Sequence, residues 1–366
     1  IGAPCVGRCE HAPVAIVGHN PVHQATTAKV EETVVAGWLE PAAPAAIDYD
    51  AYRASGGYEL LAALHRGERS VDDVVATVEA SGLRGLGGAG FPSGRKWSFV
   101  RAEPGPRVVV LNTDEGEPGT FKDRHCLETD PHRVLEGLLI AARVVEADDV
   151  YLYVRDEYAA IREVLARELA ALEADPPCPL PRLHLRRGAG AYICGEETAL
   201  IESIEGKRGE PRLRPPYPAQ RGVFGRPTLV HNVETMYWLR EILERGAEWY
   251  ASLGRRGRKG LRLFSVSGRV ARPGVYAAPA GITLRELIEE HAGGMLPGHT
   301  LYGYLPGGAS GGILPARLAD VPLDFDTLAE YGCFIGSAAI VVLSDHDRAK
   351  DVALNLMRFF AHESCG

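Results

Sequence analysis

The residues best suited to binding a ligand lie in a glycine-rich stretch at 82–97. Four of its six glycines, Gly85, Gly87, Gly88 and Gly90, are followed at once by aromatic and cationic residues: Phe91, Lys96, Trp97 and Phe99. A backbone without Cβ atoms can adopt φ > 0 and can approach a large planar or anionic ligand closely. A flexible linker would have the glycines but not the aromatic and cationic anchors. We therefore interpret this stretch as a ligand-binding loop.

The glycines at 85, 87 and 90 also match G-x-G-x-x-G, which in a dinucleotide-binding fold follows a strand and opens a helix. The preceding residues 71–80 instead place Val71, Val74, Val75 and Val78 on one face of a helix. Because a helix and not a strand leads into the glycines, the ordinary dinucleotide-binding motif is excluded.

Two further loops carry polar groups. Residues 107–111 are β-branched and predict a strand, and the acidic loop 112–124 follows its carboxyl end, where open α/β sheets bind ligands. The second loop, 188–203, is glycine-rich and runs into a helix that begins near Glu196 and Glu197. Two acids in a first helical turn stabilise the helix dipole and need no other role. That explanation does not account for the glycines and the tyrosine beside them.

The remaining pattern alternates helices and strands. Helices are predicted at 29–35, 131–145 and 157–173, and strands at 150–154 and 183–186. Such alternation indicates a parallel sheet with helices packed on it. A rigid proline-rich segment follows at 211–218, and another helix starts at 231–235. Beyond it we expect a small α+β domain at 261–335 and a final helix at 345–362.

The composition excludes several classes of protein. The chain has 366 residues, 46% hydrophobic and 24% charged, with a net charge of -8, so no basic surface argues for nucleic acid or an anionic membrane. No apolar run is as long as a membrane span and no leader is visible, so we expect a cytoplasmic protein. Seven cysteines fit reduced thiols or metal ligands better than disulfides. Because the chain begins at Ile1 and stops inside a motif, we expect both ends to be truncated.

Together, the loops at 82–99, 112–124 and 188–203 and the terminal Glu-Ser-Cys-Gly resemble the NADH-binding flavin subunit family. That family includes the 51 kDa-type flavin subunit of respiratory complex I and the diaphorase subunits of soluble NAD-linked hydrogenases and formate dehydrogenases. The sequence of residues 261–366 resembles most the β subunit of NAD-dependent molybdenum formate dehydrogenase. Cys5 and Cys9 resemble the tail of a thioredoxin-like [2Fe-2S] module that some relatives carry ahead of the flavin domain.

The resemblance implies an α/β fold with a Rossmann-like, parallel-sheet FMN- and NADH-binding domain at 57–255. A thioredoxin-like remnant at 1–37 and a linker at 38–56 would precede it. A β-grasp (ubiquitin-like) domain at 256–337 and the start of a helical [4Fe-4S] domain at 338–366 would follow. The implied activity is that of a diaphorase, which transfers hydride between NAD(H) and FMN and single electrons between FMN and iron-sulfur clusters. The implied partners are a small [2Fe-2S] thioredoxin-like subunit and a molybdenum-containing catalytic subunit. The alternatives are the flavin subunit of complex I or of an NAD-reducing hydrogenase, a flavin-free dehydrogenase, and a non-enzymatic ligand-binding or scaffold protein.

The resemblance also implies roles for single residues. FMN would contact Gly85, Gly87, Gly88, Lys96, Asn112, Asp114, Glu115, Gly116, Tyr192, Gly195, Glu196, Asn232 and Thr235. NAD(H) would stack its adenine on Phe91 and Phe99, near Glu117, Glu197, Arg214 and Tyr217. Glu117 is the only candidate catalytic group. Cys365 would be the first [4Fe-4S] ligand, but its three partners do not follow in this chain, and Cys5 and Cys9 lack the upstream pair of a [2Fe-2S] site.

Relatives from complex I commonly have Lys at position 214 and Asn at position 231, where this chain has Arg214 and His231. Arginine keeps the charge of lysine but changes its geometry, so the cofactor contact at 214 would differ.

Overall fold

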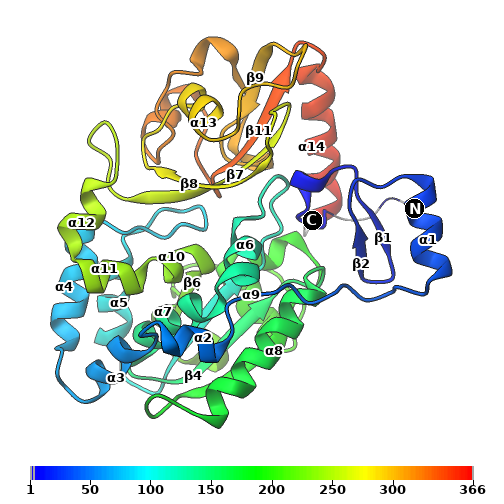
Figure 1. Cartoon of the computed structure of the whole chain (residues 1–366). Coiled ribbons are helices and arrows are strands. Elements are labelled where there is room, and N and C mark those ends of the chain that lie inside the picture. The colour runs from blue at the N-terminus through cyan, green and yellow to red at the C-terminus, as the bar shows by residue number, and fades with distance from the viewer. Residues whose placement is uncertain (1, 3–4, 365–366) are drawn as a thin grey trace. The chain divides into compact units, whose positions relative to one another are not determined.

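The computed structural model describes residue 2 and residues 5–364 and divides into two compact units (Figure 1). The larger unit comprises residues 43–115 and 123–251. The smaller unit comprises the described residues of 1–42, 116–122 and 252–366.

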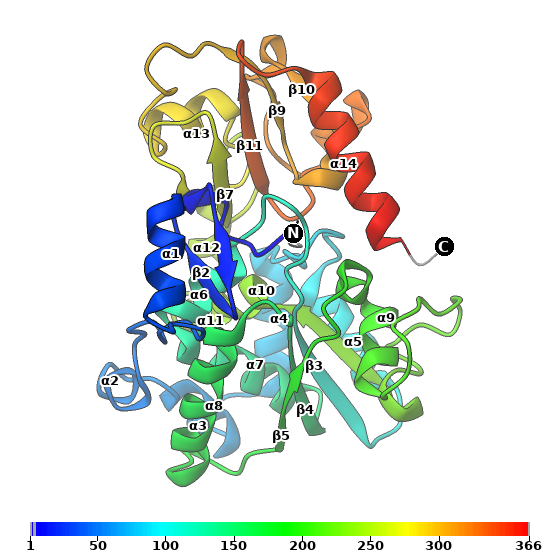
Figure 2. The same ribbon diagram turned by 90° about the vertical axis from the view of Figure 1, so that its right-hand side faces the viewer.

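The larger unit is built on a four-stranded parallel sheet. Its strands lie in the order β5 (Arg182–Arg187), β4 (Ala147–Val154), β3 (Arg107–Thr113) and β6 (Thr228–Asn232). Figure 2 shows β3, β4 and β5 as neighbours. The chain leaves β3 toward β4 and β5 and later returns to place β6 on the other side of β3. The strand order therefore reverses between β3 and β6, which makes their carboxyl ends a topological switch point.

Both faces of this sheet are buried. Val108 and Val110 of β3 pack with Leu200 and Ile201 of α9 (Glu197–Ile204) on one face. The alternate residue Val109 is also fully buried, and α7 (Pro131–Val144) packs against β3 and β4. Side chains alternate between faces along a strand, so a run of valines is what a sheet covered on both sides requires. The predicted α/β fold with a parallel sheet is confirmed.

The predicted helices of this unit are present with small shifts of their ends. The helix expected at 71–80 is α4 (Val71–Ser81), and the one at 157–173 is α8 (Ala159–Ala174). Asp130 caps α7 as its sequence suggests, because its carboxylate accepts the N–H of Arg133 at 3.1 Å. Of the remaining helices, only α10 (Val233–Tyr237) corresponds to a helix start that the sequence predicted, at 231–235. The remaining helices are α2 (Tyr49–Ala54), α3 (Glu59–His65), α5 (Ser93–Ala102), α6 (Lys122–Thr129), α10 (Val233–Tyr237), α11 (Leu239–Arg245) and α12 (Ala247–Ser252).

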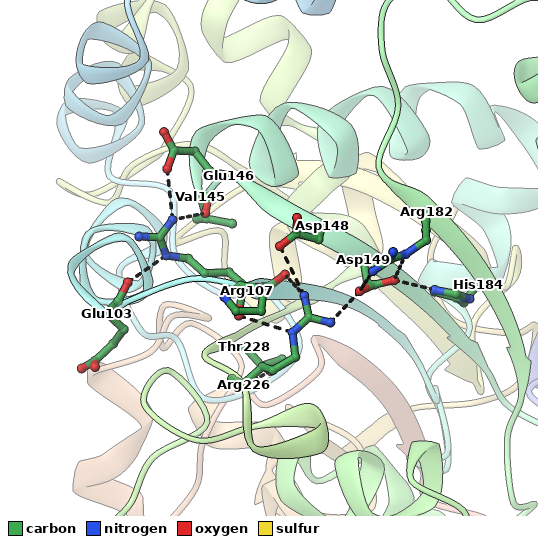
Figure 3. A network of polar contacts seen from close by, with 11 residues as sticks. Glu103, Arg107, Val145, Glu146, Asp148, Asp149, Arg182, His184, Arg226 and Thr228 are labelled. Atoms are coloured by element: carbon green, nitrogen blue, oxygen red, sulfur yellow. Dashed lines mark hydrogen bonds and ion pairs between the residues drawn. The ribbon is translucent and has the colours of Figure 1, made fainter.

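An ion-pair network ties the strands together at the amino edge of the sheet (Figure 3). Asp149 of β4 accepts two 2.7 Å hydrogen bonds from Arg182 of β5, one of 2.5 Å from Arg226 and one of 2.9 Å from His184. Arg226, just before β6, also donates to the carbonyl oxygen of Arg107 in β3 at 3.0 Å. The hydrogen bond from Arg182 and those from Arg226 and His184 hold the pKa of Asp149 well below its usual value. The network therefore links all four strands at the edge opposite the switch point.

The smaller unit contains a five-stranded mixed sheet in the order β10-β9-β11-β7-β8. Its helix α13 (Leu284–Glu290) packs on the sheet through Leu287 and Ile288, which share a core with Phe264 and Val266. A small mixed sheet covered by one helix confirms the predicted β-grasp type of domain. The strands are β7 (Leu261–Gly268), β8 (Gly274–Pro279), β9 (Leu301–Leu305), β10 (Leu314–Pro315) and β11 (Ala339–Ser344).

The terminal segments of the smaller unit are short. The strands β1 (Ala15–Val17) and β2 (Asn20–Val22) form a hairpin that precedes α1 (Thr27–Val35). Helix α1 confirms the helix expected at 29–35. The final helix α14 (Ala349–Glu363) begins four residues later than the sequence predicted. Among the residues with a described position, no helix is long and apolar enough to cross a membrane.

Candidate functional site

A cavity of about 820 Å³ opens at the carboxyl edge of the parallel sheet. Asn112 at the end of β3 and Asn232 at the end of β6 both line it, and these two residues are register partners in the sheet. The cavity therefore lies at the topological switch point, where open α/β sheets bind their ligands. Its volume falls within the range of about 300–1,000 Å³ that is usual for small-molecule sites.

The glycine loop forms one wall of the cavity and is held by its own backbone. The N–H of Gly85 donates to the carbonyl oxygen of Phe91 at 2.8 Å, and the N–H of Leu86 donates to Thr235 Oγ1 at 2.9 Å. Among the described residues, the backbone N–H groups of 87–89 have no acceptor, although all three residues line the cavity. This loop therefore presents a row of free donors to whatever fills the cavity.

Two glycines of the site have little room for a side chain. A Cβ atom on Gly87 would lie 2.9 Å from the Cβ of Asn232, and one on Gly195 would lie 3.1 Å from the carbonyl oxygen of Asp114. Gly85 is different, because the nearest atom to its added Cβ would be 3.7 Å away. A methyl group at position 85 is thus compatible with the protein itself.

Aromatic rings form a second part of the wall. The rings of Phe91 and Phe99 lie 6.1 Å apart, and their residues are 41% and 49% exposed. The Arg95 guanidinium lies 5.9 Å from each ring centroid. Exposed rings beside a cavity offer a surface on which a planar base can stack. Phe99 reaches this position from α5, a helix that the sequence did not predict.

Four charged side chains meet at the cavity. Lys96 Nζ lies 2.9 Å from Glu197 Oε2, and Arg214 lies 2.6 Å from Glu196 Oε1 and 3.5 Å from Glu197 Oε1. Glu196 is also the N-cap of α9, because its Oε2 accepts the N–H of Thr198 and of Ala199. The helix-end explanation thus holds for Glu196, whereas Glu197 joins the two cations across the cavity.

His231 was not among the predicted cofactor contacts, yet it lines the cavity. Its buried Nε2 accepts the indole N–H of Trp97 at 2.8 Å. Burial and the nearby Lys96 charge hold the pKa of His231 well below its usual value, so the ring is neutral. Its place beside Asn232 at the carboxyl end of a strand was the signal that could have identified it.

Ten more of the predicted residues line the cavity alongside Asn112, Asn232 and Phe99: Gly85, Gly87, Gly88, Phe91, Lys96, Gly195, Glu196, Glu197, Arg214 and Tyr217. Four others lie in the same unit outside its lining. The buried carboxylate of Glu115 accepts the N–H groups of Asp123 and Arg124 and the hydroxyl of Tyr158. Thr235 Oγ1 accepts the N–H of Leu86, and the N–H of Asp114 donates to Asn112 Oδ1 at the end of β3. Tyr192 lies in the 3₁₀ turn Tyr192–Gly195.

Gly116 and Glu117 belong to the smaller unit, not to the unit that contains the cavity. Glu117 Oε1 accepts the N–H and the hydroxyl of Ser310, each at 2.6 Å. These bonds hold its carboxylate within that unit, and its catalytic role stays a prediction.

The cysteines give less information. Cys365 lies outside the described residues. Cys5 and Cys9 form no disulfide in the described part of the chain, and the hydrogen bond between them raises the pKa of Cys9 together with burial. Cys126, Cys178, Cys194 and Cys333 are buried or half-buried and also form no disulfide with a described residue, as expected of structural thiols.

Two domain families match the sequence. Residues 78–241 match the Nuo51 FMN-binding domain, and residues 263–314 match the SLBB domain. The first match contains the lining of the cavity, and the second covers most of β7 and all of β8, α13 and β9.

Several known proteins are similar over most of the chain. An NADH-quinone oxidoreductase subunit from Rhizobium meliloti (strain 1021) is 46% identical over 327 residues, 86% of this chain and 77% of that protein. The mitochondrial 51 kDa subunit of NADH-ubiquinone oxidoreductase from Neurospora crassa is 45% identical over 313 residues, 81% of this chain and 63% of that protein. Among solved structures, a chain of an NAD+-reducing [NiFe]-hydrogenase in the air-oxidized state has a TM-score of 0.83 and 36% identity. The similarity covers 99% of this chain and 64% of the hydrogenase chain. The chain therefore belongs to the family of 51 kDa-type flavoprotein subunits of NADH-quinone oxidoreductases.

Proposed function

We propose that this protein is the NADH-oxidising flavin subunit of a multisubunit oxidoreductase, with FMN and NAD(H) bound in the cavity at the switch point. The observation that carries the proposal is the junction of a glycine loop, free backbone donors and exposed aromatic rings at the carboxyl ends of β3 and β6. Each of these features suits a planar, anionic ligand. Bound FMN would supply two-electron exchange with NAD(H) and one-electron exchange with iron-sulfur clusters.

The residues around the cavity fit FMN. The free N–H groups of 87–89 can donate to the polar edge of a flavin or to its phosphate, and the missing side chains at 85 and 87 let the backbone approach the ring. Lys96 has three donor hydrogens, so it can bind an anion while it stays paired with Glu197. The neutral His231 adds a polar group without a charge.

NAD(H) would occupy the part of the cavity bounded by Phe91 and Phe99. The two rings offer a stacking surface for adenine, and Glu197 can accept hydrogen bonds from ribose hydroxyl groups. Arg214 would neutralise phosphate charge, although its bond to Glu196 fixes its guanidinium. The chain's residues thus bind, orient and screen the coenzyme.

The assembly is a separate part of the proposal. Relatives named as subunits of NADH-quinone and NADH-ubiquinone oxidoreductases, and a hydrogenase chain that corresponds to 99% of this chain, favour a complex I-type or NAD-reducing hydrogenase-type assembly. The formate dehydrogenase assignment, with its molybdenum subunit, rests only on the sequence of residues 261–366. In any of these assemblies a small [2Fe-2S] subunit and a [4Fe-4S] cluster would take electrons from the flavin.

Flavin content and dye reduction test the function. Purified protein should be yellow, release FMN on denaturation, and reduce ferricyanide with NADH after reconstitution with FMN. A colourless protein that neither binds added FMN nor oxidises NADH would refute the proposal and favour a flavin-free dehydrogenase or a binding protein.

Co-purification tests the assembly. Recovery with a nickel-iron hydrogenase or with complex I subunits would support the favoured assignment. Recovery with a molybdenum subunit and formate-dependent NAD+ reduction would instead establish the formate dehydrogenase.

A further inference from the structure

We propose that His299, Asp345 and His346 form a binding site for a divalent transition-metal ion, for which Zn²⁺ is the probe. One ligand atom from each of the three residues lies within 4.8 Å of the other two. The site is in the smaller unit, at an edge of its five-stranded sheet where β9 begins and β11 ends, and belongs neither to the cavity nor to the cysteines at the chain ends.

The sheet topology brings the three residues together. His299 precedes β9, and Asp345 and His346 directly follow β11. The two strands are antiparallel and Ser344 pairs with Leu301, so the start of one strand meets the end of the other. The N–H of Asp345 also donates to the carbonyl oxygen of Thr300 at 3.0 Å. The ligands therefore stand on a fixed strand junction and not on independent loops.

Hydrogen bonds from neighbouring groups orient two of the ligands. His299 Nδ1 lies 2.8 Å from Ser344 Oγ, which also accepts the N–H of His346 and whose own proton can go to the Asp347 carboxylate at 3.4 Å. With that proton committed, we assign Nδ1–H of His299 as the donor, which leaves the Nε2 lone pair for a metal. Metal-bound histidines are usually held in this way by a partner on the other ring nitrogen. Asp345 Oδ1 accepts the N–H of Thr300 at 2.9 Å, and its Oδ2 is left to bind an ion.

The donor set selects the class of ion. Two imidazoles and one carboxylate suit Zn²⁺, Co²⁺, Ni²⁺ or Cu²⁺, whereas Mg²⁺ and Ca²⁺ prefer oxygen ligands throughout. Zn²⁺ bonds to nitrogen are about 2.0–2.1 Å long, so its ligands must approach one another more closely than 4.8 Å. The exposed His346 ring, whose centroid is 4.3 Å from that of His299, can make this adjustment by side-chain rotation. A bound ion would cross-link the ends of β9 and β11.

Titration calorimetry with Zn²⁺, on protein first dialysed against a chelator, tests the site. We expect one strong site in the wild type, no heat with Mg²⁺, and loss of that site in H299Q and in H346N. Ser344→Ala removes the partner of His299 Nδ1, together with the acceptor of the His346 N–H and the donor to Asp347, and should weaken Zn²⁺ binding by about 10–100-fold. The matched control is H11Q, because His11 and His23 form another close pair of imidazoles, with ring centroids 4.2 Å apart.

Thermal unfolding without metal must first show that each variant is folded. Since His346 is exposed, H346N gives a decisive result even where H299Q alters the strand junction. Co²⁺ provides a second measurement, because imidazole ligation changes its visible absorption. The proposal would be overturned if the wild type does not bind Zn²⁺. It would also be overturned if Zn²⁺ binding survives in H346N and disappears in H11Q.

Discussion

Gly85→Ala is the substitution that best separates flavin binding from folding. Gly85 lines the cavity, does not adopt a left-handed φ, and has no neighbour closer than 3.7 Å to an added Cβ. The methyl group should therefore cost the protein nothing and can stabilise it by about 0.4–1 kcal/mol, because alanine reduces the entropy of the unfolded chain. The flavin, however, would lose the close approach that a bare backbone allows.

The loss of affinity follows from the size of the methyl group. Overpacking of a filled site by one methyl costs about 1–3 kcal/mol. At about 1.4 kcal/mol per factor of ten, this cost weakens the Kd for FMN about 5- to 140-fold. Gly87→Ala should behave differently, because its Cβ would lie 2.9 Å from the Cβ of Asn232, which caps α10. That variant should lose both stability and flavin.

The assay combines urea unfolding of the flavin-free protein with a titration that follows the quenching of FMN fluorescence. Gly105→Ala is the matched control, since an added Cβ there has open space around it and the residue does not line the cavity. A folded Gly85→Ala variant that binds FMN as tightly as the wild type would show that the glycine loop does not contact the flavin. Equal weakening by Gly105→Ala would show that the effect is not local.

Three further predictions concern single polar contacts. Asp149→Asn should lower the free energy of unfolding at pH 7 by about 1.5–3 kcal/mol, because charged hydrogen bonds are lost. Since the pKa of Asp149 is depressed in the folded state, its contribution to stability is present above the unfolded pKa and is lost on acidification. Urea titrations should show that the difference in unfolding free energy between the variant and the wild type shrinks below about pH 4. A difference that stays constant with pH would contradict the network. Glu197→Gln should weaken NADH binding and reduce the ratio of kcat/KM for NADH over NADPH, whereas an unchanged ratio in a flavin-loaded variant would limit Glu197 to helix-dipole and ion-pair roles. Thr235→Val leaves the buried N–H of Leu86 without its acceptor, which costs about 1–3 kcal/mol and should weaken FMN binding, while Thr235→Ser should restore both.

Local sequence rules predicted many of the elements around the site. Valine spacing at 71–78 predicted α4, the Asp-Pro pair at 130–131 predicted the start of α7, and the β-branched run at 107–111 predicted β3. Each of these signals acts within a few residues, because capping and side-chain periodicity depend on near neighbours alone. The two glycine loops could be recognised as ligand loops for the same reason, since what distinguishes them is an absence of side chains.

Helix α5 is one element that the sequence did not reveal, because its local signals conflict. Helix α5 contains Gly94 and three aromatic or cationic residues that suggested loop anchors, and its helical form depends on burial of Trp97 and Val100. Tertiary packing of this kind overrides weak propensity.

Only the tertiary structure decided which groups meet. Lys96 and Glu197 are 101 residues apart, and Trp97 reaches His231 from a different element. The pairing of Asn112 with Asn232 depends on the return of the chain to place β6 beside β3. The Glu115 carboxylate is outside the cavity lining and is bound instead by the hydroxyl of Tyr158 and by two N–H groups of α6. Periodicity reports that a face is buried, but not against what, because many strand orders bury the same valines equally well. The position of the site is therefore set by long-range pairing, whose free energy is gained only after the whole sheet has closed.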